Sequence, residues 1–326
     1  MPVKNEGLYL EECLKSIVAQ SEKNWELLVC DDHSEDNTKE IIFNFCSKHP
    51  KIKYFTNQGK GIIPALITAY DKSKGEIITR MDGDDVMPPQ KLSSLRTILA
   101  LNGKGTVATG KVKYFPEEQI ADGFYTYQNW LNNLCVNKIH WEEIYKECVI
   151  PSPCWMIYKE DFDACGGFKN STYPEDYDLV FRMYQNKLKV NASKETLHLW
   201  RDHPLRTSRN STHYQTQTFF ELKLKYLFEI EKLNAKNLVV WGAGKKGKIL
   251  SSHLRERNKE HRWVCNNPNK IGHFIERIKL EDYNAISNIK NACVIITVSG
   301  HEDRSEIITF LESNGLVKNE SYFLFC

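Results

Sequence analysis

Short apolar runs alternate with helical stretches along the first hundred residues. The runs at 25–30, 51–55 and 76–81 have the length and composition of strands buried in a sheet. Between them, the stretches at 37–47 and 62–72 predict helices, and residues 7–20 predict another near the start. This alternation favours an α/β layer built on a mostly parallel sheet.

The pattern changes after residue 120. An aromatic-rich helical stretch at 121–150 is suited to covering one side of a cleft, and residues 215–233 form a long amphipathic segment. New strands are expected at 238–241, 262–265 and 292–298. We therefore predict an α/β catalytic domain at 1–214, a helical connector at 215–236 and a smaller Rossmann-like α/β domain at 237–326.

The first strand is unusual, since residues 1–4 resemble only the end of one. Either this strand is very short, or it is truncated and the natural start lies upstream. We expect the second.

Composition excludes several classes of protein. Hydrophobic residues make up 41% of the 326, and 44 basic residues nearly balance 42 acidic ones, so nucleic acid is not expected as the partner. There is no apolar run of about 18 residues and no signal-peptide pattern, so no transmembrane segment is expected. The ten cysteines are scattered without zinc-site spacing. A reduced, cytoplasmic protein is expected.

Acidic residues follow two of the predicted strands, where ligands of open α/β sheets gather. Asp82, Asp84 and Asp85 follow the strand at 76–81, and carboxylates at this spacing can share a Mg²⁺ or Mn²⁺ ion. A solvated turn in which Asp85 caps the next helix is the alternative. The run at 31–38 also suits a turn, although one of its carboxylates could bind a base or ribose.

Four motifs in order resemble those of the family-2 glycosyltransferases, which have the glycosyltransferase-A fold. They are Pro-Val-Lys-Asn-Glu at 2–6, Asp-Asp-His-Ser-Glu-Asp-Asn-Thr at 31–38, Asp-Gly-Asp-Asp at 82–85, and Gly-Gly-Phe at 166–168 followed by Pro-Glu-Asp-Tyr-Asp-Leu at 174–179. Any one of these would be weak, but four in this order over about 180 residues are specific.

The resemblance implies a donor side and an acceptor side. On the donor side, Pro2 and Val3 would lie beside the nucleotide and Asp31 would contact the base, with Asp32 as the alternative. Asp82 and Asp84 match the family's Asp-x-Asp motif, with Asp84 the best candidate for direct contact with Mn²⁺ or Mg²⁺.

On the acceptor side, Asp176 matches the family's general base. An inverting transfer needs one such base to deprotonate the attacking hydroxyl. Glu175 and Asp178 are alternatives, and Asp178 suits a structural role better.

A basic stretch at 200–209 contains three arginines and a histidine, among them Arg201 and His203, that could contact the donor diphosphate. A basic surface loop is the alternative, and for His203 a hydrogen-bonding role is favoured over metal ligation. One departure from the family is the absence of a basic residue at 64–68, for which Lys60 or Arg80 could substitute.

A strand followed by Gly242, Gly244 and Gly247 begins the second domain and has the Gly-x-Gly-x-x-Gly pattern of a dinucleotide-binding fold. The acid expected after the next strand is replaced by Asn266, so NAD(P) is not expected there. A structural, regulatory or nucleotide-sensing role is favoured over a working dehydrogenase.

The leading hypothesis is therefore an inverting transfer of a sugar from a nucleotide-sugar donor to a saccharide or lipid-linked saccharide, in the synthesis of cell-surface polysaccharide or lipopolysaccharide. A membrane-bound acceptor would make peripheral contact with the inner face of the membrane sensible. The main alternative is a non-catalytic nucleotide-sugar-binding scaffold. A bifunctional redox enzyme and a nucleotidyltransferase explain the motifs less well.

Overall fold

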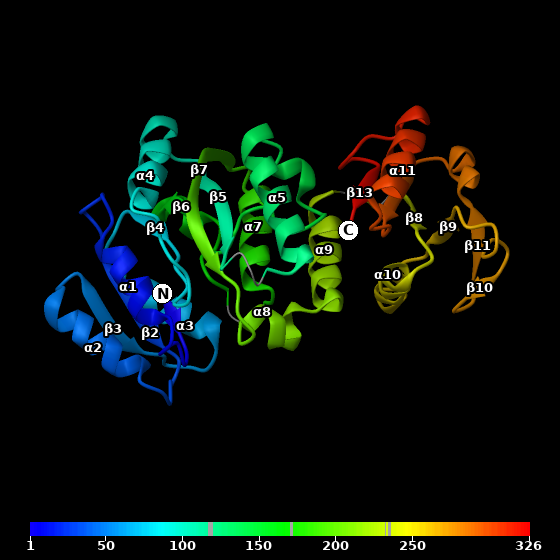
Figure 1. The fold of residues 1–326 in the computed structure, drawn as a ribbon. Helices are drawn as coiled ribbons and strands as arrows, with labels where there is room; N and C mark the ends of the chain where they lie inside the picture. The colour runs from blue at the N-terminus through cyan, green and yellow to red at the C-terminus, as the bar shows by residue number, and fades with distance from the viewer. Residues whose placement is uncertain (117–119, 170–171, 232, 234–235) are drawn as a thin grey trace. The chain divides into compact units, whose positions relative to one another are not determined.

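The chain forms two compact units in the computed structural model, which describes residues 1–116, 120–169, 172–231, 233 and 236–326 (Figure 1). The first unit comprises Met1–His140 and Val149–Asn210, and the second comprises Trp141–Cys148 and Ser211–Cys326. Helix α9 (Thr216–Ile230), which we expected to connect two domains, belongs to the second unit. Residues 232, 234 and 235 of the predicted connector lie outside the described residues.

A parallel three-stranded sheet of order β1-β2-β3 opens the first unit. All five residues of β2 are buried, which is why its sequence is continuously apolar up to Asp31. Helix α1 buries Leu10, Cys13, Leu14 and Ile17, the spacing of one helical face. The elements are β1 (Pro2–Val3), α1 (Leu10–Val18), β2 (Leu27–Asp31), α2 (Thr38–Lys48), β3 (Ile52–Thr56) and α3 (Ile62–Asp71).

A mixed four-stranded sheet of order β4-β6-β5-β7 completes the first unit. Strands β5 and β7 are parallel, but β6 runs antiparallel to both β4 and β5, a departure from the mostly parallel sheet that we predicted. A buried apolar strand looks the same in either direction, so the sequence pattern could not show this. The elements are β4 (Ile77–Thr79), α4 (Lys91–Asn102), β5 (Thr106–Phe115), α5 (Asp122–Asn137), β6 (Trp155–Tyr158), α6 (Lys159–Ala164), α7 (Glu175–Gln185), β7 (Lys189–Arg201) and α8 (Thr207–Asn210).

The second unit has the strand order of a Rossmann sheet. Its strands follow β10-β11-β9-β8-β12-β13, and the five from β11 to β13 are parallel. The order reverses between β8 and β12, so a switch point lies at the carboxyl ends of these two strands. After α9, the elements are β8 (Asn237–Trp241), α10 (Lys245–Glu256), β9 (Arg262–Cys265), β10 (Phe274–Ile275), β11 (Ile278–Asp282), β12 (Ala292–Ile296), α11 (His301–Ser313) and β13 (Tyr322–Leu324).

Candidate active site

The two aspartates that end β2 are buried and shape the loops around them. Asp31 accepts hydrogen bonds from the backbone N–H of Ser34 at 3.0 Å and from the Ser34 hydroxyl at 2.6 Å, and the Tyr54 hydroxyl lies 3.3 Å from its other oxygen. Asp32 accepts from the Asn57 side chain at 2.6 Å and from the Gly61 backbone at 2.9 Å. Both aspartates thus organise turns, and contact of Asp31 with a base stays a prediction.

Strand β1 brings Val3 against the acidic loop that follows β4. Pro2 pairs with Cys30 and Val3 with Asp31 across the parallel ladder. A Cβ added at Gly83, between Asp82 and Asp84, would lie only 2.9 Å from Val3 Cγ1, so a side chain there would clash. The small residue therefore lets the predicted nucleotide-side strand and the predicted metal loop pack together.

Asp84 is tied to the end of β7 although more than a hundred residues separate them in sequence. Its Oδ2 lies 3.0 Å from His203 Nε2, and its backbone oxygen accepts a hydrogen bond from Arg201 Nε at 2.7 Å. The Arg201 guanidinium also pairs with Glu12. Arg201 and His203 thus both reach the acidic loop, and Arg201 already has protein partners.

Arg80 joins the acidic loop to the acceptor-side helix. Its Nε lies 2.9 Å from Asp82 Oδ1, and its Nη1 lies 2.9 Å from Glu175 Oε1, the first residue of α7. Arg80 and Glu175 are buried, whereas the Asp82 side chain keeps 24% of its exposure. Of the two proposed substitutes for the missing basic residue, Arg80 thus lies in this cluster, and Lys60 lies exposed on a loop.

Asp176, the predicted base, lies half-buried beside this ion pair. Its carboxylate accepts a hydrogen bond from the Tyr177 backbone at 2.8 Å. Desolvation, reinforced by the negative charge of Glu175, raises the pKa of Asp176 to about 7, although Arg80 opposes the shift. A carboxylate that changes charge near neutral pH is suited to accepting a proton in catalysis.

The third acidic residue of α7 has a different environment. Asp178 is 1% exposed and forms an ion pair with Arg182 at 2.8 Å. Arg182 in turn donates to the backbone oxygen of Gly167 at 2.7 Å. Asp178 thus holds the glycine turn that precedes α7, and the described contacts give it no access to a substrate.

Arg206, one of the three arginines of the basic stretch, and Glu6 also belong to the cluster. Arg206 is only 8% exposed and packs over the Trp200 ring at 5.2 Å, and its Nη1 has no hydrogen-bond partner within the described part of the chain. Burial and the charges of Asp84 and Asp82 raise the pKa of Glu6 to about 8. The only sequence signals were the position of Glu6 in the first motif and of Arg206 in the basic stretch.

The residues present fit a divalent cation. No set of three His, Cys, Asp or Glu side chains in the described ranges is already arranged as a metal-binding group. However, Mg²⁺ and Mn²⁺ commonly take one or two protein carboxylates together with substrate phosphates. Asp82 and Asp84 would supply these oxygens. Burial, together with the negative charges of these two aspartates, raises the pKa of Glu6, and a cation would offset that negative charge.

Comparison with known proteins decides the family. The sequence model described as glycosyl transferase family 2 matches residues 1–166, half of the chain. The chain belongs to glycosyl transferase family 2. It is therefore a glycosyltransferase. The match includes the acidic loop and ends before α7, β7 and Ser211–Cys326, the longer segment of the second unit.

Individual glycosyltransferases resemble the chain over different lengths. The glycosyltransferase GlyG of Streptococcus pneumoniae is 24% identical over 211 residues, which cover 62% of this chain and 69% of that protein. The UDP-Glc:alpha-D-GlcNAc-diphosphoundecaprenol beta-1,3-glucosyltransferase WfgD of Escherichia coli is 35% identical over 103 residues, covering 31% of this chain and 40% of that protein.

A solved glycosyltransferase shows the same fold. The mannosyltransferase PcManGT of Pyrobaculum calidifontis, in complex with GDP-Man and Mn²⁺, aligns with a TM-score of 0.52 at 18% identity. The alignment covers 70% of this chain and 61% of that one, so it supports the α/β fold of this glycosyltransferase and no finer property. In the described ranges, this family-2 chain has no helix that is long and apolar enough to span a membrane.

The second unit of this glycosyltransferase places its three glycines at the switch point. A Cβ on Gly247 would lie 1.9 Å from the Gly242 backbone oxygen, so helix α10 can approach β8 only without a side chain there. A Cβ on Gly244 would meet nothing within 4 Å. Asn266, at the end of β9, is exposed in place of a ribose-binding acid. The glycine spacing therefore has a clear packing role. Whether the glycine loop also binds a ligand is not tested by these contacts.

Proposed function

We propose that this glycosyltransferase is an inverting enzyme that moves a sugar from a nucleotide-sugar donor to a hydroxyl acceptor. The observation that carries the proposal is the Arg80 bridge, which holds Asp82 and Glu175 at 2.9 Å each. It keeps the Asp-x-Asp loop beside the neighbour of Asp176. One buried side chain thus contacts both a donor-side carboxylate and the residue that precedes the proposed base.

On the donor side, Asp84 and Asp82 would hold Mn²⁺ or Mg²⁺. His203, 3.0 Å from Asp84 Oδ2, lies close enough to join them. The bound ion supplies positive charge for the departing nucleoside diphosphate. Arg206, with a buried and unpartnered nitrogen among the described residues, adds a fixed positive charge near this loop. The complex of PcManGT with GDP-Man and Mn²⁺ supports this assignment.

On the acceptor side, Asp176 accepts the proton of the attacking hydroxyl. The acceptor oxygen forms the bond to the anomeric carbon, while the bond from that carbon to the donor phosphate oxygen breaks. The diphosphate leaves with the electron pair, and no covalent link to the enzyme is needed. Attack opposite the leaving group inverts the anomeric centre.

For the acceptor we propose a lipid-linked saccharide of cell-surface polysaccharide or lipopolysaccharide synthesis. The name of WfgD, which specifies a UDP-Glc donor and a diphosphoundecaprenol-linked saccharide, supports this class. Such an acceptor would bring the protein to the inner face of the membrane by peripheral contact. Donor and acceptor identity have to be measured, because the match to WfgD covers 31% of the chain.

A donor screen tests the proposal. UDP-, GDP-, dTDP- and CMP-sugars are incubated with the full chain and Mn²⁺ or Mg²⁺, and released nucleotide is quantified. We expect turnover with one donor class and a loss of about 100-fold or more in Asp84→Ala, the order of effect for a group that stabilises transition-state charge.

Absence of turnover for every donor, with tight nucleotide binding retained, would favour the non-catalytic scaffold. Release that is unchanged in Asp84→Ala would remove this residue from the donor site.

A further inference from the structure

Three polar side chains are buried together behind the acidic loop of the first unit. Lys91, the first residue of α4, and His198 on β7 are 0% exposed, and Asp85 is 1% exposed. Lys91 Nζ lies 3.0 Å from His198 Nδ1, and His198 Nε2 lies 2.9 Å from Asp85 Oδ2. Lys91 also donates to the Pro153 backbone oxygen at 2.6 Å. The three form a continuous chain of polar contacts.

The donors and acceptors in this chain assign its protons. A lysine ammonium can only donate, so His198 Nδ1 must accept. The histidine proton then lies on Nε2 and is donated to the Asp85 carboxylate. Each of the three side chains therefore has a polar partner. A buried polar network is stable only when it is satisfied in this way.

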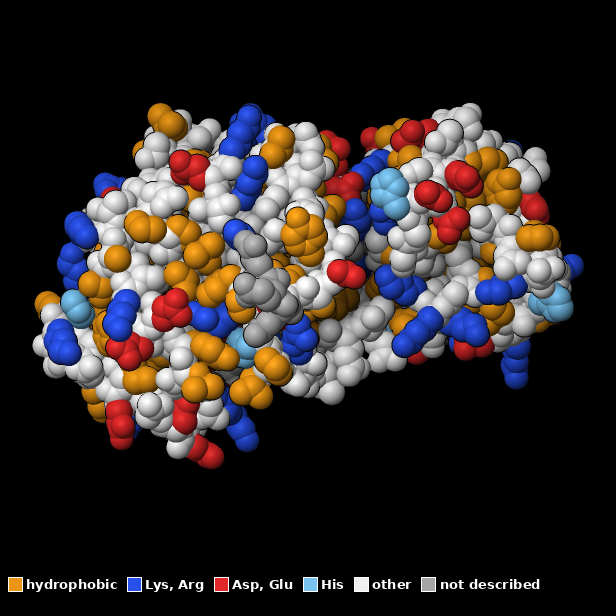
Figure 2. Space-filling view, viewed as in Figure 1, with side chains coloured by type: hydrophobic (Ala, Val, Ile, Leu, Met, Phe, Trp, Pro, Cys, Tyr) orange, Lys and Arg blue, Asp and Glu red, His pale blue; other side chains and the backbone are white. Residues whose placement is uncertain are grey.

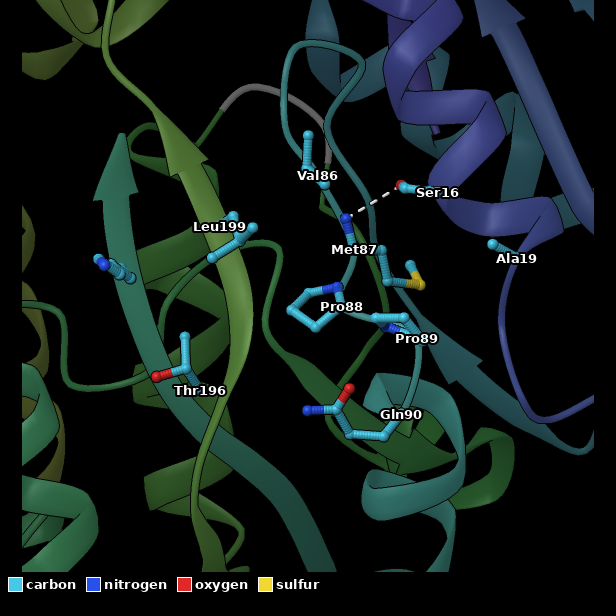
Figure 3. A pocket seen from close by; sticks show the side chains of 10 residues that line it. Ser16, Ala19, Val86, Met87, Pro88, Pro89, Gln90, Thr196 and Leu199 are labelled. Carbon is cyan, nitrogen blue, oxygen red and sulfur yellow. Dashed lines mark hydrogen bonds between the residues drawn. The ribbon is translucent and has the colours of Figure 1, made fainter. Parts of the chain in front are cut away.

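Asp85 connects this network to the end of β7. Its second oxygen, Oδ1, accepts a hydrogen bond from the Arg201 backbone at 2.8 Å. The next residue, Val86, exchanges two backbone hydrogen bonds with Leu199, at 3.1 and 3.0 Å. Figure 3 shows Val86 and Leu199 close together where the loop passes β7. The loop after Asp84 is therefore fastened to β7 by side-chain and backbone contacts together.

The same end of β7 holds Asp84 itself. Arg201 Nε donates to the Asp84 backbone oxygen at 2.7 Å, and His203 Nε2 lies 3.0 Å from its carboxylate. A shift of β7 relative to the loop would therefore move both partners of Asp84. Lys91 and His198 connect α4 to β7 through a buried contact, and Ser94 and Glu195 connect the same two elements through an exposed one.

We propose that Lys91, His198 and Asp85 form a positioning network that fixes the carboxylate of Asp84 for the divalent cation, an inference that rests on the proposed function. None of the three touches the cation or the donor. Buried polar chains of this kind gain little stability over apolar packing of the same volume. The effect of this network is instead to fix the position of the Asp84 carboxylate relative to His203.

The test compares His198→Leu and His198→Gln with Lys223→Met in the full chain. Gln keeps a side-chain N–H that can reach Asp85, whereas Leu removes both contacts. Lys223 is the matched control, because it is a lysine that is 2% exposed and donates to backbone oxygens of Lys146 and Phe325, but it belongs to the second unit. Mn²⁺ is titrated in the presence of UDP or GDP, with free Mn²⁺ read by electron paramagnetic resonance, and each melting temperature is recorded.

We expect His198→Leu to weaken Mn²⁺ binding about 10- to 100-fold, the effect of removing a group that orients a metal ligand, with a smaller loss in His198→Gln. Lys223→Met should lower the melting temperature and leave Mn²⁺ affinity unchanged. Unchanged affinity in both folded His198 variants, or an equal loss in Lys223→Met, would overturn the positioning role alone. A wild-type protein that neither binds Mn²⁺ with nucleotide nor releases nucleotide would overturn the proposed function and this inference with it.

Discussion

Each unit has a strand that runs directly into a loop with candidate ligand-binding groups, and the charges that follow the two strands are opposite. In the first unit the loop after β4 carries Asp82 and Asp84. In the second unit the loop after β8 carries glycines, the first turn of α10 carries Lys245, Lys246 and Lys248, and Figure 2 shows basic side chains gathered over α10. The fold provides a place for a ligand in each unit, and the loop residues decide its chemistry.

Packing around the glycines sharpens this contrast. Gly83 lets the acidic loop pack against Val3, and so brings the carboxylates of this loop close to strand β1. Gly247 brings α10 against β8, but no carboxylate follows in the same loop. We therefore expect sugar transfer to depend on the first unit's strand-end acids and to be indifferent to those of the second.

The largest effect should come from a pair of matched acid-to-amide changes. Asp176→Asn removes the proposed base and should lower transfer about 10²- to 10⁴-fold while donor binding is retained. Asp282→Asn, at the end of β11 in the second unit, should leave transfer unchanged. Transfer is measured with the donor found in the screen, and binding by calorimetry. Loss of donor binding in Asp176→Asn would remove this residue from the role of base.

The pH profile gives an independent check of the same residue. Because burial and Glu175 raise the pKa of Asp176 to about 7, the carboxylate is increasingly protonated as the pH falls below that value. A protonated base cannot accept the acceptor proton, so kcat/KM for transfer should fall on the acid side of about pH 7. Asp176→Asn should lose this limb, and a wild-type profile that is flat down to pH 5 would argue against Asp176.

Alanine substitutions at two glycines of the second unit should destabilise the protein to different extents. Gly247→Ala places a Cβ against the Gly242 backbone oxygen and should cost about 1–3 kcal/mol or more of unfolding free energy. Gly244→Ala, with open space around it, should cost less than about 1 kcal/mol, the scale of a changed helix cap. Denaturant unfolding measures both. Equal losses would mean that the glycine spacing does not serve the packing of α10 on β8.

The smallest effect should be that of dinucleotides on the melting temperature. NAD⁺ or NADP⁺ should leave the melting temperature unchanged, because Asn266 replaces the acid that would bind ribose. UDP or GDP with Mn²⁺ should raise it by binding the folded first unit. A clear increase with NAD⁺ would assign a redox cofactor to the second unit and contradict our interpretation of Asn266.

The sequence predicted where several strands lie along the chain better than it predicted how the strands pair. The strand expected at 262–265 is β9, residue for residue, because a turn with two asparagines ends its apolar run. The strand expected at 76–81 is β4, which pairs only over Ile77–Thr79. We expected no strand at β6, and its direction was not predictable either, since an apolar pattern does not show which way a strand runs.

The candidate site was predictable only where its residues form motifs. Asp82, Asp84 and Asp176 stand in recognisable runs, although their roles remain predictions. His198 and Lys91 do not, because a histidine in an apolar strand and a lysine at a helix start are ordinary in isolation. Their significance arises from contacts across 107 positions of sequence, which no local pattern encodes.

The Arg80 bridge has a consequence for protein engineering. One guanidinium serves as counter-ion to the donor loop through Asp82 and to the acceptor helix through Glu175. A chimera that exchanges α7 and its flanking loop to change acceptor preference would therefore also alter the charge balance at the donor loop. Residues 80, 82 and 175 are linked by ion pairs, so a graft should carry all three together.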